Sequence, residues 1–133
     1  MPKQARTILL VEDNEDNRIV YSTILRHSGY AVLEANSGET GLELARTAQP
    51  ALILMDIGLP GMDGFEATVC LRSNESTRDI PVIALTAHTL PEHRARALEV
   101  GCDGFLTKPV EPREVLATVR RHLDDRPDLA PSR

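Results

Sequence analysis

The chain has 133 residues, of which 41% are hydrophobic and 26% are charged, values typical of one folded globular domain. Fifteen Lys and Arg against 20 Asp and Glu give a formal charge of −5, and the only aromatic residues are two Tyr and two Phe. A nucleic-acid-binding surface needs clustered positive charge or stacking aromatic residues, so nucleic acid is not an expected partner.

Two further classes are excluded by the apolar runs and the cysteines. The longest early apolar run, residues 8–11, is too short for a signal peptide or a membrane span, so no membrane association is expected. Cys70 and Cys102 are too few and too far apart for a disulfide framework or a cysteine metal site. The pair indicates reduced thiols in a cytoplasmic protein.

Short apolar segments rich in β-formers alternate with segments of helical periodicity along the chain. Strands are expected at residues 7–11, 30–35, 51–55, 80–85 and 104–107. Helices are expected at about 14–28, between 37 and 50, and at about 65–74, 91–100 and 112–123. Glycines at 29 and 101 and prolines at 50 and 109 provide the breaks between these elements.

The first, third and fourth strands are apolar on both faces. This pattern is typical of a parallel sheet that helices cover on both sides, which predicts an α/β fold. One domain is expected over residues 1–124, followed by a flexible C-terminal tail at 125–133.

Side chains with chemical potential follow most of these strands. Glu12 and Asp13 follow the first strand, Asp56 the third, Thr86 the fourth and Lys108 the fifth. Ligands of open α/β sheets bind beyond the carboxyl ends of the strands, so these groups are expected to converge.

Their chemistry points to a metal ion and an anion. Three carboxylates at close range repel one another unless a proton or a cation intervenes, and oxygen ligands favour Mg²⁺ or Ca²⁺. Thr86 and Lys108 would complete a cradle for a phosphoryl group. A carboxylate can itself accept that group, and Asp56 is the natural candidate because it stands alone after the central strand.

Four segments at strand ends carry a resemblance that covers residues 6–124. They read VEDN at 11–14, LMDIGLPGMDG at 54–64, LTA at 85–87 and LTKP at 106–109. In this combination and order they resemble the receiver domain of two-component response regulators, the chemotaxis-regulator-like family. The resemblance implies a flavodoxin-like (βα)5 fold, doubly wound around a five-stranded parallel sheet in the order 2-1-3-4-5.

The resemblance also implies a role for each residue of the acidic group. Asp56 would be the phosphoacceptor. Glu12 and Asp13 would hold Mg²⁺ together with Asp56, and the backbone carbonyl of Gly58 would be a further metal ligand. Lys108 would bind the phosphoryl oxygens, and the peptide bond that follows it, to Pro109, would be cis.

Further roles follow from the same resemblance. Thr86 would also bind the phosphoryl oxygens and, with Phe105, would form the switch that reports phosphorylation. Gly58 and His88, each two residues beyond a site residue, would tune the lifetime of the phosphorylated state.

The function expected is that of a single-domain response regulator. A sensor histidine kinase or histidine phosphotransfer protein would donate a phosphoryl group to Asp56. A downstream protein would then bind the face formed by the fourth helix, the fifth strand and the fifth helix. The chain would be a signalling phosphoacceptor rather than an enzyme, although it would assist its own Mg²⁺-dependent phosphorylation and dephosphorylation.

Three alternatives stay open at this point. The chain could be the receiver part of a longer regulator or hybrid kinase. It could be an interaction module of the same fold that works without phosphorylation, although the intact acidic cluster argues against this. A phosphatase with an aspartate nucleophile usually needs a second acid two residues on, and Gly58 occupies that position.

Overall fold

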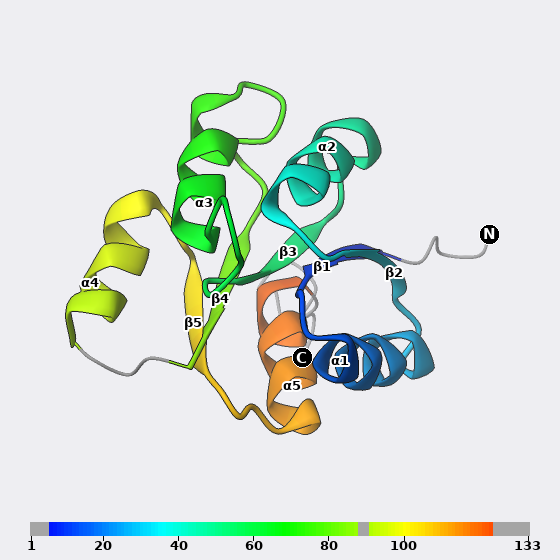
Figure 1. The fold of residues 1–133 in the computed structure, drawn as a ribbon. Coiled ribbons are helices and arrows are strands. Elements are labelled where there is room, and N and C mark those ends of the chain that lie inside the picture. Colours follow the sequence, from blue (N-terminus) through cyan, green and yellow to red (C-terminus); the bar gives the residue numbers. More distant parts are fainter. Residues whose placement is uncertain (1–5, 88–90, 124–133) are drawn as a thin grey trace, which may run out of the picture.

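The structure is a computed structural model that describes residues 6–87 and 91–123. Five parallel strands form one sheet in the order β2-β1-β3-β4-β5, with helices on both faces (Figure 1). The strands are β1 (Thr7–Val11), β2 (Ala31–Ala35), β3 (Leu52–Asp56), β4 (Val82–Thr86) and β5 (Gly104–Thr107). The helices are α1 (Glu15–His27), α2 (Gly38–Ala48), α3 (Gly64–Ser73), α4 (Pro91–Val100) and α5 (Pro112–Leu123). The predicted fold class and strand order are confirmed, whereas His88 and the predicted tail at 125–133 lie outside the described residues.

The boundaries differ from the expected ones chiefly at β4. The expected strand began at Ile80, but the Ile80 amide donates to the Thr77 carbonyl and closes a turn. Pro81 has no amide to donate, so ladder pairing begins at Val82 and extends to Thr86. β3 likewise extends one residue further than expected and includes Asp56. Asp56 and Thr86 are therefore the last residues of strands β3 and β4, where the sheet holds their backbones.

The core consists of two apolar layers, one on each face of the sheet. Alternate residues of β4 point to opposite faces: Val82 and Ala84 belong to one layer, and Ile83 and Leu85 to the other. The first layer packs against α2, α3 and α4, and the second against α1 and α5 (Figure 1). The central strands β3 and β4 are buried at every position, as their apolar sequences predict.

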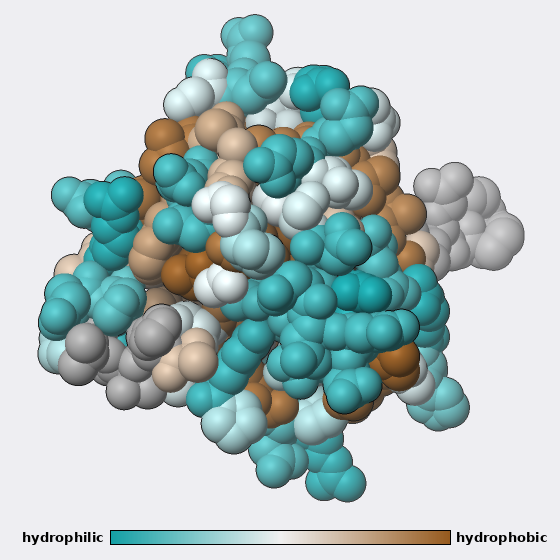
Figure 2. All heavy atoms as spheres, viewed as in Figure 1, coloured by the Kyte–Doolittle hydropathy of each residue, from teal (hydrophilic) through white to brown (hydrophobic). Residues whose placement is uncertain are grey.

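Figure 2 shows a face covered mainly by hydrophilic side chains, with hydrophobic residues visible in smaller areas between them. Among the described residues, the exposed large hydrophobic side chains are those of Ile19, Val20, Val69 and Leu98. No helix within residues 6–87 and 91–123 has the length and apolarity needed to cross a membrane.

The start of α3 is fixed directly against the end of β3. The Asp63 side chain accepts a hydrogen bond from the Glu66 amide at 2.8 Å, and the Glu66 side chain accepts one from the Asp63 amide at 3.0 Å. This capping box satisfies two amides at the beginning of the helix. A Cβ atom at Gly64 would collide with the carbonyl oxygen of Asp56, so only glycine permits this approach. The helix thereby supports the backbone of Asp56.

Candidate functional site

The structure brings the predicted acidic residues together at the carboxyl ends of β1 and β3. These strands are neighbours, with Val11 paired to Met55, so the residues that follow Val11 lie beside the end of β3. Carboxylate oxygens of Glu12, Asp13 and Asp56 all lie within 4.8 Å of one another. The prediction that these three acids form one cluster is therefore correct.

Lys108 provides the positive charge that the cluster contains. Its ammonium nitrogen lies 2.8 Å from Oε1 of Glu12 and 3.1 Å from Oδ2 of Asp56. The Lys108 amide donates to the Thr86 carbonyl at 2.7 Å, which ties the residue after β5 to the end of β4. The Lys108–Pro109 peptide bond is cis, as the family resemblance implied.

Glu12 is the most deeply buried member of the cluster, with no exposed surface. Its Oε2 atom accepts a hydrogen bond from the Asn14 amide at 3.1 Å. Burial raises the pKa of Glu12 to about 7, against the opposing effect of Lys108 and with a further increase from the adjacent Asp56. Glu12 therefore titrates near neutral pH in the absence of a bound cation.

The surroundings of Lys108 favour its charged form. Burial alone would lower its pKa, but the hydrogen bond to Glu12 and the negative charges of Asp56 and Glu12 more than compensate and raise the pKa above its ordinary value. Lys108 therefore stays protonated over the range in which Glu12 titrates.

Asp56 is held by its own loop and by Lys108. It is 4% exposed, and its Oδ1 atom accepts a hydrogen bond from the Gly58 amide at 3.0 Å. Its other oxygen, Oδ2, contacts Lys108. Both oxygens are thus oriented before any ligand arrives.

A cavity of about 270 Å³ opens beside these carboxylates. It is lined by Glu12, Asp13, Asn14, Asn17, Asp56, Gly58, Ala87 and Lys108. A cavity of this size is large enough for a phosphoryl group with associated water, since one water occupies about 30 Å³ in the liquid.

The donor set fits a hard divalent cation. When all three acids are ionised, they exceed the single ammonium by two negative charges. The side-chain ligands in the cluster are carboxylates, with no His or Cys in this group of described residues. Oxygen ligands and a surplus of negative charge favour Mg²⁺ over softer metals.

The predicted switch residues lie on one face of the sheet. Thr86 is 1% exposed at the end of β4, and Phe105 is half-buried on β5. The register pairs Ala84 with Phe105 and Thr86 with Thr107. Since residues two apart on a strand share a face, Thr86 and Phe105 point to the same side.

Sequence reasoning missed the residues that support the loop after β1. Arg18 donates to the Glu12 carbonyl at 2.9 Å and to Oε1 of Glu34 at 3.2 Å. Arg26 contacts the other oxygen of Glu34 at 3.0 Å. Glu34 thus connects two arginines of α1 to β2. Their spacing on α1 gives no signal of a shared partner, because that partner lies on a different strand.

Comparison with known proteins agrees with this architecture. Residues 8–120 match the model of the response regulator receiver domain. The chain is 38% identical over 120 residues to the polar-differentiation response regulator DivK of Brucella ovis, covering 90% of this chain and 98% of that protein. The chemotaxis response regulator CheY4 of Vibrio cholerae has a similar structure, with a TM-score of 0.85 at 33% identity, covering 90% of this chain and 99% of that one.

A third relative carries a metal ion. The receiver domain of the sensor histidine kinase PA1611 from Pseudomonas aeruginosa has a TM-score of 0.81 at 38% identity, covering 88% of this chain and 96% of that chain. That structure has a magnesium ion coordinated in its active site cleft. The present chain belongs to the response regulator receiver domain family. Phosphorylation-dependent signalling is the general function of this family, whose receiver domains take phosphate from histidine kinases or phosphotransfer proteins.

Proposed function

We propose that the chain accepts a phosphoryl group on Asp56 from a phosphohistidine of a sensor histidine kinase or histidine phosphotransfer protein. The observation that carries the proposal is the placement of the Asp56 carboxylate, which is buried, 3.1 Å from the Lys108 ammonium and next to two further acids. Such a group is shielded from bulk water yet borders a cavity that a phosphoryl group can enter.

The reaction is a direct transfer between two protein side chains. One Asp56 oxygen attacks phosphorus, the phosphorus–nitrogen bond of the phosphohistidine breaks, and the imidazole leaves with its electron pair. The product is a mixed anhydride between the carboxyl group and phosphate. Phosphoryl transfer needs mainly positioning and charge stabilisation, which the partly buried Lys108 beside the acceptor supplies.

Glu12, Asp13, Asp56 and the Gly58 carbonyl would hold Mg²⁺. The bound ion would offset the repulsion between the acids and the incoming phosphoryl oxygens. Lys108 would move from the carboxylates to a phosphoryl oxygen, and the Thr86 hydroxyl would bind another.

Mass measurement tests the phosphoacceptor. The wild type incubated with acetyl phosphate and Mg²⁺ should gain one phosphoryl group, and Asp56→Asn should gain none. Asp79→Asn is the matched control, because Asp79 is an exposed acid on the α3–β4 connection, away from the cavity. Equal labelling of Asp56→Asn and the wild type would refute the assignment.

We further propose that phosphorylation is read on the face formed by α4, β5 and α5. A phosphoryl oxygen that draws the Thr86 hydroxyl toward it leaves space on the side where Phe105 lies, and the ring can then turn inward. A downstream protein would distinguish the two positions of the ring. This is a two-state packing element biased by a local charge.

Thr86→Ala tests the coupling, with Thr107→Ala as control because Thr107 is the register partner of Thr86 on β5. Thr86→Ala should still accept phosphate on Asp56 but lose the phosphorylation-dependent chemical-shift changes in α4 and β5. Thr107→Ala should keep them. A full wild-type pattern in Thr86→Ala would eliminate Thr86 as the coupling residue.

A further inference from the structure

Helix α4 buries very little apolar surface of its own. Only Ala97 is buried in this helix, whereas Leu98 is 71% exposed. Helices in proteins are normally held by the packing of an apolar face rather than by their intrinsic propensity. The attachment of α4 therefore depends on other contacts, and these differ along its length.

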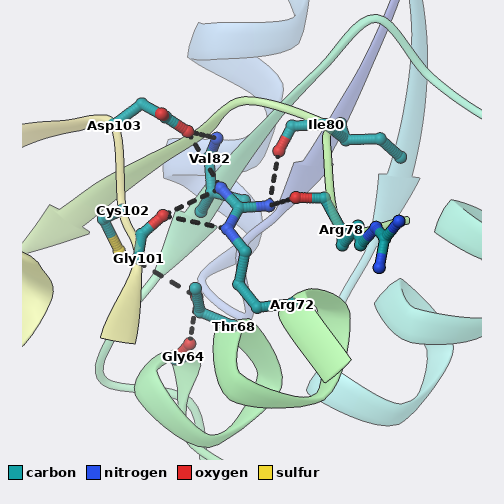
Figure 3. Close-up of polar contacts among 9 residues, drawn as sticks. All are labelled: Gly64, Thr68, Arg72, Arg78, Ile80, Val82, Gly101, Cys102 and Asp103. Carbon is teal, nitrogen blue, oxygen red and sulfur yellow. Dashed lines mark hydrogen bonds and ion pairs between the residues drawn. The ribbon is translucent and has the colours of Figure 1, made fainter. Parts of the chain in front are cut away.

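The C-terminal end of α4 is fixed by Arg72 of α3 (Figure 3). Two guanidinium nitrogens of Arg72 donate to the Gly101 carbonyl at 3.0 and 2.8 Å, and one of them also donates to the Asp103 carboxylate at 2.9 Å. The same Asp103 oxygen accepts the Val82 amide at 2.9 Å. Gly101 has a φ of +102°, which favours glycine. The turn between α4 and β5 is thus tied to α3 and to the start of β4.

Within the helix itself, α4 is attached through arginine–aromatic contacts at Arg94 and Arg96. The guanidinium carbon of Arg94 lies 5.0 Å from the ring centroid of Phe105, and that of Arg96 lies 5.8 Å from the ring centroid of Phe65. Both distances fall within the range of cation–π attraction. The two rings belong to different elements, β5 for Phe105 and α3 for Phe65. Since both arginines are exposed, water can replace either contact at small cost.

Of these two contacts, the one made by Arg94 involves the switch ring. Phe105 lies opposite Ala84, which offers only a methyl group between Phe105 and Thr86 on that face of the sheet. A ring that moves toward Thr86 therefore meets little steric resistance from β4, but it must leave the guanidinium of Arg94.

We propose that Arg94 is a latch that holds the Phe105 ring in its half-buried position and thereby opposes the switch. Arg94 is a positioning residue, because it acts through Phe105 and does not touch the acidic cluster. The inference rests on the proposed function in one respect: phosphorylation of Asp56 supplies the free energy that releases the ring.

Removal of the latch should change two measurable quantities: the position of the Phe105 ring and the affinity of the Asp56 site for a phosphoryl analogue. Loss of an exposed cation–π contact shifts the equilibrium of the ring toward Thr86 about two- to fivefold. Because apparent affinity rises with the fraction of protein in the binding-competent state, the binding of a phosphoryl analogue at Asp56 should tighten by up to the same factor.

The first experiment needs no phosphorylation. The chain contains only two Phe, so ring-labelled protein gives separate NMR signals for Phe65 and Phe105. Arg94→Met keeps the apolar stem and removes the charge, and it should change the side-chain rotamer population of Phe105 but not of Phe65. Arg96→Met is the matched control on the same helix and should affect Phe65 only. Arg94→Lys restores a cation and should return Phe105 toward the wild-type population.

The second experiment measures affinity for beryllofluoride in the presence of Mg²⁺. Arg94→Met should bind about two- to fivefold more tightly than the wild type, with Arg94→Lys in between. Arg96→Met should bind as the wild type does.

The outcomes separate the latch from the proposed function. An unchanged Phe105 population in Arg94→Met, or equal effects of both methionine variants on both rings, would overturn the latch. Unchanged beryllofluoride affinity in Arg94→Met would overturn its link to the switch. A wild type that binds no beryllofluoride would count against the proposed function, and the ring populations would still decide whether Arg94 holds Phe105.

Discussion

The two ends of the sheet each contain a largely buried cation surrounded by oxygen atoms, and the cations differ in how fully their surroundings are paired. At the amino end of β4, all five N–H donors of Arg72 are used by four acceptors: the carbonyls of Gly101, Arg78 and Ile80 and the carboxylate of Asp103 (Figure 3). At the carboxyl end of the sheet, the Lys108 ammonium contacts two of the three clustered carboxylates, and negative charge remains in excess.

This difference separates a structural network from a binding site. The Arg72 network is closed, because each donor has an acceptor and the acceptors are mainly backbone carbonyls that cannot change charge. The network around Lys108 is open, since its carboxylates repel one another and a cavity lies beside them. We therefore expect mutations at the first end to cost stability, and mutations at the second to change ligand binding, pH response and reaction rates.

The largest effect is expected for Arg72→Met, which would remove the guanidinium donors of the partly buried Gly101 and Ile80 carbonyls, whereas the Asp103 carboxylate would keep the Val82 amide as a donor. Each such loss costs about 1–3 kcal/mol, so the free energy of unfolding should fall by about 3 kcal/mol in total. Chemical denaturation followed by circular dichroism measures this change.

Two variants control for loss of the Arg72 side chain. Arg72→Lys should recover less than half of the stability, because an ammonium cannot reproduce the planar donor fork. Arg78→Met removes an exposed arginine side chain nearby and should be almost neutral. A loss below 1 kcal/mol in Arg72→Met would show that the network is not a principal contributor to stability.

The second prediction concerns pH and Glu12. Its pKa is raised from 4.5 to about 7 in the fold, so between these values the native state binds more protons than the unfolded state. The contribution of protonated Glu12 to the free energy of unfolding is therefore fully present below pH 4.5 and is lost as the pH rises through 7. In metal-free buffer, the free energy of unfolding of the wild type should fall by about 2 kcal/mol between about pH 5 and pH 8, relative to that of Glu12→Gln over the same range.

The charged groups that face Glu12 do not reverse the direction of this pH dependence. Lys108 stays protonated over that range because its pKa is raised, and Asp56 adds a negative charge that disfavours ionised Glu12. Parallel stability curves for the wild type and Glu12→Gln would contradict the prediction.

The third prediction concerns the metal. Asp13→Asn removes one oxygen anion of the cluster, so affinity for Mg²⁺ should fall by about tenfold or more. The same substitution relieves repulsion, so the metal-free protein should be no less stable than the wild type. Chemical shifts followed during Mg²⁺ titration give the affinity. Asp16→Asn, an exposed acid in the first turn of α1, should bind Mg²⁺ as the wild type does, and equal affinity in Asp13→Asn would refute the role of Asp13.

The acidic cluster could be predicted from the sequence because a general rule links chain position to location. Parallel strands have their carboxyl ends at one edge, so Glu12, Asp13, Asp56 and Lys108 had to lie near one another once the strands were assigned. Their types then indicated the chemistry. The boundaries were less accurate, since the apolar character of Ile80 suited a strand although the adjacent proline prevents early pairing.

No comparable rule exists for Arg72 or Arg94. The acceptors of Arg72 include backbone carbonyls, which every residue has, and Gly101 lies 29 residues away. The contact between Arg94 and Phe105 depends on how α4 sits against β5, and the weak apolar pattern of α4 does not define that packing. Such contacts are set by tertiary structure and leave no local pattern.

The smallest predicted effect concerns the lifetime of the phosphorylated state. A Cβ atom at Gly58 would have one close neighbour, Oδ1 of Asp56 at 3.7 Å, an ordinary van der Waals distance. Larger residues therefore fit at this position, and their side chains would project beside the site of the acyl phosphate. Gly58→Leu should slow hydrolysis by more than about twofold, about 0.4 kcal/mol in barrier height, because an apolar side chain obstructs the attacking water.

The Asn side chain has as many heavy atoms as that of Leu but can hydrogen-bond that water, so Gly58→Asn should dephosphorylate faster than Gly58→Leu. Gly61→Ala is not a suitable control, because Gly61 has a φ of +73° and the substitution would be strained. Leu59→Ile alters a buried neighbour without reaching the cavity lining and should leave the rate unchanged. Phosphate release from acetyl-phosphate-labelled protein measures each rate. If both Gly58 variants stay within about twofold of the wild type, the open space beside Asp56 does not limit hydrolysis.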